Sequence, residues 1–204
     1  QCAYVCPHAC IRPFLATDEE AEKAPEGTEF IQGVAKTKEY KFRIQVSTLD
    51  CTGCGSCADV CPSKEKSLIM VPLDDKQKPE IEKWHYLHNN VGYKDYILPK
   101  DKTVKNSQFA RPLFEFSGAC AGCGETPYIK LVTQLFGETM IIANATGCSS
   151  IFGGSAPATP YTTNENGDGP AWANSLFEDN AEYGYGMALA NRKQRDIIEN
   201  KMKH

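Results

Sequence analysis

The sequence lacks three features, and each absence excludes a class of protein. No apolar run reaches the roughly 18–20 residues that a membrane-spanning helix requires, so we expect no membrane partner. Basic residues are not in excess, since 22 Lys and Arg stand against 26 Asp and Glu, which argues against a nucleic-acid partner. No secretory segment precedes the cysteines, which argues against an exported, disulfide-linked domain. We therefore expect a compartment in which thiols stay reduced.

What the sequence does contain is cysteine, with ten in 204 residues. Reduced thiols at this density indicate metal binding. The length fits one large or two small domains. Because the sequence does not start with methionine and stops within a charged helical pattern, we expect it to be a piece of a longer polypeptide.

The most specific motif is CTGCGSCADVCP at residues 51–62. Its spacing is that of the bacterial ferredoxin run, which wraps a [4Fe–4S] cluster. Gly53 and Gly55 supply turns that residues with side chains resist, and Pro62 directs the chain away from the cluster. The motif predicts an iron–sulfur site, with a zinc ribbon as the alternative.

Residues 2–7, CAYVCP, repeat the second half of this run. In two-cluster ferredoxins the fourth cysteine of each run binds the other cluster. We therefore assign Cys6 to one cluster with the first three cysteines of the later run, and expect about four irons on the isolated chain. The later run's last cysteine and the first cysteine of the chain belong to a second cluster, whose other ligands would lie upstream. The ligands are thus Cys6, Cys51, Cys54 and Cys57 in the first set and Cys2 and Cys61 in the second.

The alternative for Cys2 and Cys6 is that they are ordinary buried thiols. Cys10 fits no ligand spacing, and we expect it to be a small buried residue. A capping box at residues 17–20 predicts a short helix, and alternating apolar residues over 40–46 predict a half-buried strand. We expect residues 68–71 to pair with this strand. These elements predict an α+β ferredoxin-like domain at residues 1–72, truncated at its N-terminus.

Residues 73–113 are polar and are expected to connect two domains across the surface, with a short helix near residues 80–89. His85 and His88 lie three residues apart on that helix. They have the spacing of metal ligands, but a solvated helix face explains them better.

An α/β domain is predicted from residue 114 to residue 204, truncated at its C-terminus. Cys120 and Cys123 precede a helix for which Thr126 is the expected N-cap and Pro127 the first residue. An apolar run at residues 139–143 predicts a buried parallel strand, which Cys148 follows. The expected core face of the helix consists of Ile129, Leu131, Val132, Leu135 and Phe136.

Ligands of such sheets bind beyond the carboxyl ends of the strands, so both cysteine loops are expected at one edge. The helix start after Cys123 offers N–H groups to an anion such as a cluster or a diphosphate. The alternative for Cys120 and Cys123 is that they are buried thiols or zinc ligands. Asp168, in a Gly-Asp-Gly sequence, resembles a magnesium ligand but does not follow a buried strand.

Nearly the whole chain resembles pyruvate:ferredoxin (flavodoxin) oxidoreductases, multidomain enzymes that cleave 2-oxo acids. The resemblance rests on LDCTGCG at 49–55, FEFSGACAGCGETPY at 114–128, NATGCSSI at 144–151 and GPAWANSLFED at 169–179. It implies three [4Fe–4S] clusters, thiamine diphosphate and Mg²⁺. It assigns a proximal cluster to Cys120, Cys123, Cys148 and a further cysteine downstream, and places Glu125 and the Cys148 loop against thiamine diphosphate.

The resemblance further implies oxidative decarboxylation of pyruvate to acetyl-CoA and CO2, with coenzyme A as acetyl acceptor and ferredoxin or flavodoxin as electron acceptor. A homodimer is expected for the full-length enzyme, in the cytoplasm or in a reducing organelle such as a hydrogenosome. The groups that bind pyruvate would lie upstream, so we assign no catalytic residue to this stretch. The alternative is a ferredoxin-type electron-transfer protein without its own catalytic site.

Overall fold

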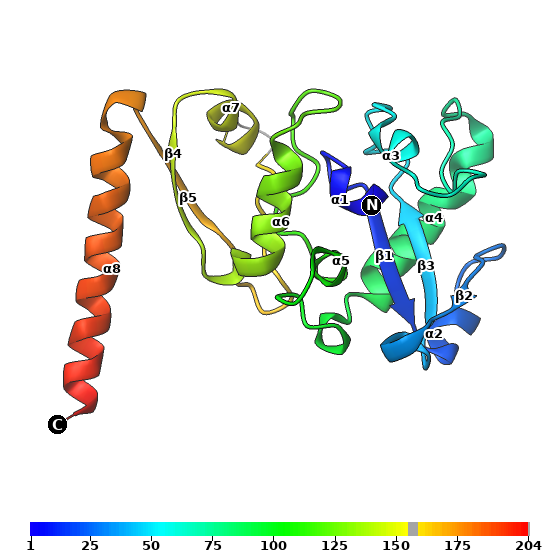
Figure 1. Cartoon of the computed structure of the whole chain (residues 1–204), viewed down its shortest axis with the longest axis horizontal. Helices are drawn as coiled ribbons and strands as arrows, with labels where there is room; N and C mark the ends of the chain where they lie inside the picture. The colour runs from blue at the N-terminus through cyan, green and yellow to red at the C-terminus, as the bar shows by residue number, and fades with distance from the viewer. Residues whose placement is uncertain (155–158, 204) are drawn as a thin grey trace.

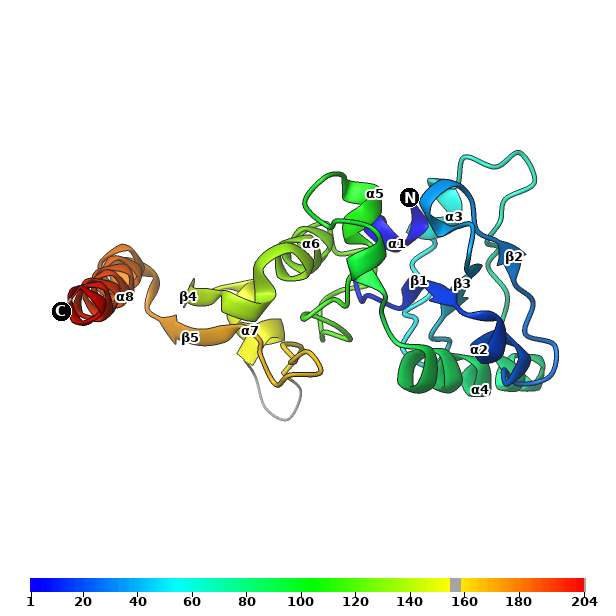
Figure 2. The ribbon, with the colours of Figure 1, turned by 90° about the horizontal axis from the view of Figure 1, so that it is seen from below.

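The computed structural model describes residues 1–154 and 159–203. The chain is elongated: the three-stranded sheet lies at one end and a long C-terminal helix at the other (Figures 1 and 2). Two separate sheets, ordered β1-β3-β2 and β4-β5, make it a mixed α/β structure. No helix of the described residues is both long and apolar enough to cross a membrane.

The first sheet is antiparallel and contains the predicted strand. β3 (Lys41–Val46) lies at its centre, between β1 (Ile11–Ala16) and β2 (Ile31–Gln32). All six residues of β1 are buried, and Ile11 pairs with Val46 at the end nearest the cysteines. The prediction of a strand at 40–46 is therefore confirmed.

The strand partner predicted at residues 68–71 is wrong. That stretch has no strand structure, and Ile69 is 72 % exposed. β1 takes the place beside β3 because both of its faces are buried, with the apolar side chains of Phe14 and Leu15 on opposite faces, and this burial outweighs the proximity of the later segment along the chain.

The short helix α2 (Asp18–Glu22) begins with the predicted capping box. The Thr17 hydroxyl accepts from the Glu20 amide at 3.2 Å, and the Glu20 carboxylate accepts from the Thr17 amide at 2.7 Å. Lys94 also donates to this carboxylate, at 2.9 Å, so the cap joins α2 to a distant segment.

Removing the cap is expected to destabilise the protein modestly. In Thr17→Ala the Glu20 amide loses its partner, and N-cap losses of this kind cost about 1 kcal/mol. Urea unfolding under anaerobic conditions measures the effect. Thr163→Ala, at an exposed position, is the control. Equal midpoints for the two variants would contradict the prediction.

The segment at residues 73–113 contributes to the core as well as crossing the surface. Its helix α4 (Lys78–Tyr86) continues as a π-helical turn at Leu87–Val91. Trp84, Leu87 and Val91 are buried against Phe14 of β1. The helix expected near residues 80–89 is confirmed, but the expectation that the segment lies over the surface is wrong for this helix. Its apolar residues are spaced at a helical period that composition alone conceals.

The second half of the chain contains a small parallel sheet. β4 (Ile141–Ala145) pairs in parallel with β5 (Ala171–Ser175), as expected for a strand of an α/β unit. The prediction that this strand is buried and begins at residue 139 is wrong: none of its residues is buried and Ile141 is 48 % exposed, because the sheet formed by the described residues has only two strands. Helices α6 (Thr126–Phe136) and α7 (Cys148–Gly154) flank β4 in sequence, and α8 (Asn180–Met202) ends the chain. Shorter helices are α1 (Cys2–Val5), α3 (Ser56–Asp59) and α5 (Val104–Ser107).

Helix α6 buries the face opposite to the predicted one. Val132 is 41 % exposed and Phe136 62 % exposed. The buried positions are largely polar: Thr126, Pro127, Lys130, Thr133 and Gln134. They face the first half of the chain, where Gln134 donates to the Ala110 carbonyl at 2.9 Å and accepts from the Gln108 amide at 3.1 Å. Directed hydrogen bonds, which the hydrophobic pattern does not encode, decide this orientation. The cap also differs by one residue, since Glu125 is the N-cap and Thr126 the first helical residue.

Candidate functional site

The predicted cluster loop has the backbone that its glycines imply. Gly53 and Gly55 adopt φ angles of +70° and +80°, in the region that residues with a Cβ rarely enter. Gly55 is the N-cap of α3, which carries Cys57. The two turns bring three cysteines of one short segment to the same cavity.

Five cysteines from two distant segments line one cavity, and four of them are predicted ligands of one cluster. Cys51, Cys54 and Cys57 come from the glycine-rich loop, and Cys6 comes from the end of α1. This is the ligand set that crossed ligation predicts. Cys6 is buried, while Cys51 and Cys54 are exposed at the mouth. The lining also includes Pro7, His8, Cys10, Ile11, Thr52, Gly55 and Met70.

The environment of Cys6 favours a thiolate. A hydrogen bond from the Cys10 thiol lowers the pKa of Cys6 to about 5, against the opposing effect of burial. The same contact and burial raise the pKa of Cys10, so Cys10 stays protonated. Cys10 is 1 % exposed and donates to the Asp50 carbonyl at 3.1 Å, next to the cluster loop. The prediction that Cys10 is a small buried residue is confirmed, and Cys10 forms part of the buried lining of the cavity.

The second predicted ligand pair lies on the same two short helical segments. Cys2 begins α1, and Cys61 follows α3. The Ser67 amide donates to the Cys61 sulfur at 3.3 Å. Backbone hydrogen bonds of this kind, the largest from Ser67, lower the pKa of Cys61 to about 7. Both thiols are half-buried and accessible to a cofactor.

The donor set of the cavity suits an iron–sulfur cluster. Four of the thiols that line it have the spacing of the ferredoxin run, and Cys thiolates are the ligands of [4Fe–4S] clusters. Within the described residues, no three His, Cys, Asp or Glu side chains form a group that could hold a single metal ion.

The third cysteine set lies at the start of α6 and of α7. The Cys123 amide donates to the Cys120 carbonyl at 3.0 Å, which closes a turn around Gly122. Cys148 opens α7, just beyond the carboxyl end of β4. Figure 1 shows α1, α3, α7 and the loop that leads into α6 on one side of the molecule. This is the single edge that we expected, although Cys148 does not join the other two in a close group among the described residues.

The Cys120–Cys123 loop contacts the first cluster loop directly. A Cβ placed on Gly122 would lie 3.7 Å from the Cβ of Cys54. Nearby, His8 joins the two regions through hydrogen bonds with residues just ahead of the loop. Its ring Nδ1 lies 3.0 Å from the Ser117 carbonyl, and its own carbonyl accepts from the Phe116 amide at 3.0 Å. The two cysteine loops are therefore held side by side.

The other candidate residues do not line the cysteine cavity. Glu125 is exposed at the start of α6, where its charge acts on Tyr161. Asp168 lies in an exposed turn, in which its amide donates to the Asn164 side chain at 3.0 Å. His88 stacks on Trp84 with ring centroids 5.6 Å apart. Among the described residues, neither this aspartate nor the two histidines belong to a group that could hold a metal ion.

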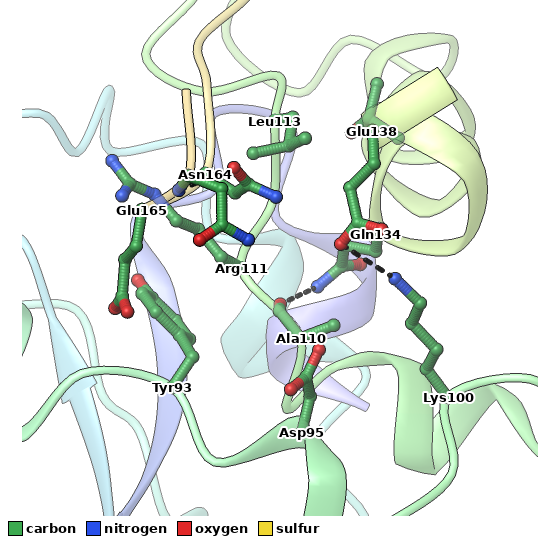
Figure 3. A pocket seen from close by; sticks show the side chains of 12 residues that line it. Tyr93, Asp95, Lys100, Ala110, Arg111, Leu113, Gln134, Glu138, Asn164 and Glu165 are labelled. Atoms are coloured by element: carbon green, nitrogen blue, oxygen red, sulfur yellow. Dashed lines mark hydrogen bonds and ion pairs between the residues drawn. The ribbon is translucent and has the colours of Figure 1, made fainter. Parts of the chain in front are cut away.

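A separate hollow lies away from the cysteines, between α6 and residues 93–111 (Figure 3). Its volume of about 190 Å³ is below the 300–1,000 Å³ typical of ligand pockets. Lys100 pairs with Glu138 across it at 3.4 Å, and Gln134 donates to the Ala110 carbonyl beside this pair. These contacts join α6 to the segment ahead of it, so we interpret the hollow as part of the packing of α6. The buried Nε of Arg111 in its lining has no hydrogen-bond partner among the described residues.

The sequence pattern did not predict a role for three buried residues. Lys130 and Arg12 are each 2 % exposed, and His8 is 3 % exposed. Lysine and arginine are normally at the surface, so their burial follows from contacts between segments more than 100 residues apart. A buried His8 was the easiest to suspect, because it comes directly after the Cys6-Pro7 end of a cluster motif.

Comparison with known proteins agrees with this geometry. Residues 1–64 match the model of the 4Fe-4S dicluster domain. The chain is 62 % identical to pyruvate:ferredoxin oxidoreductase of Moorella thermoacetica over 201 residues. This match covers 97 % of the chain and 17 % of that protein. It is 57 % identical over its whole length to pyruvate-flavodoxin oxidoreductase of Enterobacter agglomerans, again 17 % of that protein. A third relative, pyruvate dehydrogenase [NADP(+)] of Cryptosporidium parvum, is 54 % identical over 96 % of the chain and 10 % of its own length.

Proposed function

The chain is homologous to one segment of the pyruvate:ferredoxin and pyruvate-flavodoxin oxidoreductases, and we propose that it serves as the electron-transfer segment of such an enzyme. The chain spans about a sixth of the length of these relatives. The proposed reaction is the oxidation of pyruvate and coenzyme A to acetyl-CoA and CO2, with two electrons passed to ferredoxin or flavodoxin. The observation that carries the proposal is the contact between the two cysteine loops.

Each cysteine set has a distinct role in this proposal. Cys6, Cys51, Cys54 and Cys57 hold one [4Fe–4S] cluster, while Cys2 and Cys61 contribute to a second. Cys120, Cys123 and Cys148 contribute to the third, beside thiamine diphosphate. When bound, the clusters supply one-electron carriers, and thiamine diphosphate with Mg²⁺ supplies the carbanion chemistry of decarboxylation.

The closeness of the two cysteine loops supports a proposed order of the three sets. Gly122 lies against Cys54, which belongs to the set completed by Cys6. The site assigned to the proximal cluster is thus next to that set, and the set containing Cys2 and Cys61 is proposed to lie farther out, toward ferredoxin or flavodoxin. Gly122 has a φ of +75°, so it supplies the left-handed position that the turn between Cys120 and Cys123 requires.

The start of α6 is the proposed contact with thiamine diphosphate. Glu125 is its exposed N-cap residue, and Cys148 opens α7 at the end of β4. Helix starts and the carboxyl ends of parallel strands are the usual positions for a diphosphate in α/β domains. We propose that Glu125 and the Cys148 loop lie against this cofactor. Residues 1–72, 73–113 and 114–204 are the proposed domain divisions.

A test of the proposal is reduction of the clusters by substrate. The complete protein, purified without oxygen, is expected to contain about twelve irons and an equal amount of sulfide. Addition of pyruvate and coenzyme A is expected to produce paramagnetic resonance signals of reduced clusters. Clusters that dithionite reduces but pyruvate does not would favour an electron-transfer protein without its own catalytic site. A colourless, zinc-containing protein would contradict both functions.

A further inference from the structure

Lys130 is a buried lysine that reaches from α6 to the cysteine-bearing helix α1. The residue is only 2 % exposed. The ammonium donates to the Ala3 carbonyl and, at 3.1 Å, to the Tyr4 carbonyl. These carbonyls lie between Cys2 and Cys6, which belong to different clusters in the function proposed above. One cation therefore contacts the backbone of the short helix that serves both clusters.

In the part of the chain that the structure describes, no carboxylate pairs with this ammonium. The ion pairs formed by the described residues do not include Lys130. Lys83, which is also buried, differs because its ammonium lies 2.7 Å from Glu80. A buried charge without a partner is costly, so it is retained where another negative group compensates it.

The main negative group that acts on Lys130 is the Cys6 thiolate. Burial and the positive charge of Arg12 lower the pKa of Lys130 to about 8, against the opposing effect of Cys6. A [4Fe–4S] cluster bound by thiolates is anionic and gains one more negative charge when it is reduced. The ammonium thus has a stronger interaction with the reduced cluster than with the oxidised one.

We propose that Lys130 is a positioning residue that supplies the counter-charge for the cluster bound by Cys6 and raises its reduction potential. The inference rests on the proposed function, because it requires a cluster at Cys6. Helix α6 begins directly after the Cys120–Cys123 loop, so the same helix carries the proximal loop and the charge that acts on the neighbouring cluster. Lys130 therefore favours electron transfer from the proximal site to that neighbour.

Two substitutions separate charge from hydrogen bonding. Lys130→Gln keeps a donor for the carbonyls of α1 but removes the charge, whereas Lys130→Arg keeps both. Lys83→Gln is the control, because it removes a buried lysine that has its own carboxylate. Each variant is made in the complete protein and titrated anaerobically, with paramagnetic resonance as the readout. The signal of the Cys6 cluster is identified by its loss in Cys54→Ala.

In Lys130→Gln, one-electron reduction of this cluster is expected to become at least tenfold less favourable, which is about 59 mV more negative. Lys130→Arg and Lys83→Gln are expected to retain the original potential. Loss of iron from the glutamine variant but not from the arginine variant would support the same role of the charge. Equal shifts, equal iron loss or no shift in both Lys130 variants would overturn the proposal. Absence of clusters from the unsubstituted protein would instead contradict the proposed function itself.

Discussion

Cys54→Ala is expected to remove about four of about twelve irons per polypeptide and to block electron delivery to ferredoxin or flavodoxin. Cys54 lines the cavity shared with Cys6, Cys51 and Cys57, and it contacts the Cys120–Cys123 loop through Gly122. Substitution of residues that merely support a metal ligand costs 10–100-fold in metal affinity or activity, so loss of a ligand is expected to exceed about 100-fold. Iron analysis and pyruvate-dependent reduction of flavodoxin measure the two effects.

The matched control is Cys10→Ala. Cys10 lines the same cavity and is 1 % exposed, but it stays protonated and donates to the Asp50 carbonyl. The Cys10→Ala variant is expected to keep all of its iron, with a shifted reduction potential at most, because the neighbouring thiol that lowers the pKa of Cys6 is lost. Full iron content in Cys54→Ala, or equal iron loss in both variants, would show that the assigned ligand set is wrong.

Arg12→Met is expected to cause the largest loss of stability in the first half of the chain. Arg12 is 2 % exposed and pairs with Glu115, while its Nε donates to the Ala9 carbonyl at 2.9 Å. Its guanidinium also lies over the rings of Trp84 and Phe116, at 5.1 and 5.3 Å from their centroids. Removal of one partner leaves the Glu115 carboxylate largely buried and unpaired, which typically costs about 3–5 kcal/mol.

Anaerobic urea unfolding of the protein with its clusters measures this effect. Glu115→Gln and the double variant complete a thermodynamic cycle that isolates the pair from the aromatic contacts. The control is Lys23→Met, which breaks an exposed ion pair with Glu19 and is expected to leave the midpoint unchanged. A midpoint in Arg12→Met as high as in Lys23→Met would contradict the assigned role of Arg12 in joining β1 to the segment ahead of Cys120.

Local features were predictable because nearby residues encode them. The positive φ angles of Gly53 and Gly55, the capping box at Thr17 and the strand at residues 41–46 all follow from residues within a few positions of each other. The pairing of Cys6 with the later cysteines was also predictable, although 45 residues separate it from Cys51, because the motif carries the rule of crossed ligation.

Long-range choices were not encoded in this way. The sequence pattern favours residues 68–71 as the partner of β3, and the apolar side of α6 as its core face. The folded chain instead selects β1 and the polar side of α6. Both outcomes depend on which surfaces are available across the molecule, a property that periodicity does not contain.

Cysteine spacing alone was thus sufficient to identify the iron–sulfur motif and to predict that Cys6 lies in one cavity with three cysteines of the later run, because a cluster must be reached from short, glycine-containing loops. Only the tertiary structure shows that the two cysteine loops are neighbours and that the charges of Lys130 and Arg12 are buried. The cost of a buried charge depends on every group that surrounds it, and those groups come from residues more than 100 positions apart.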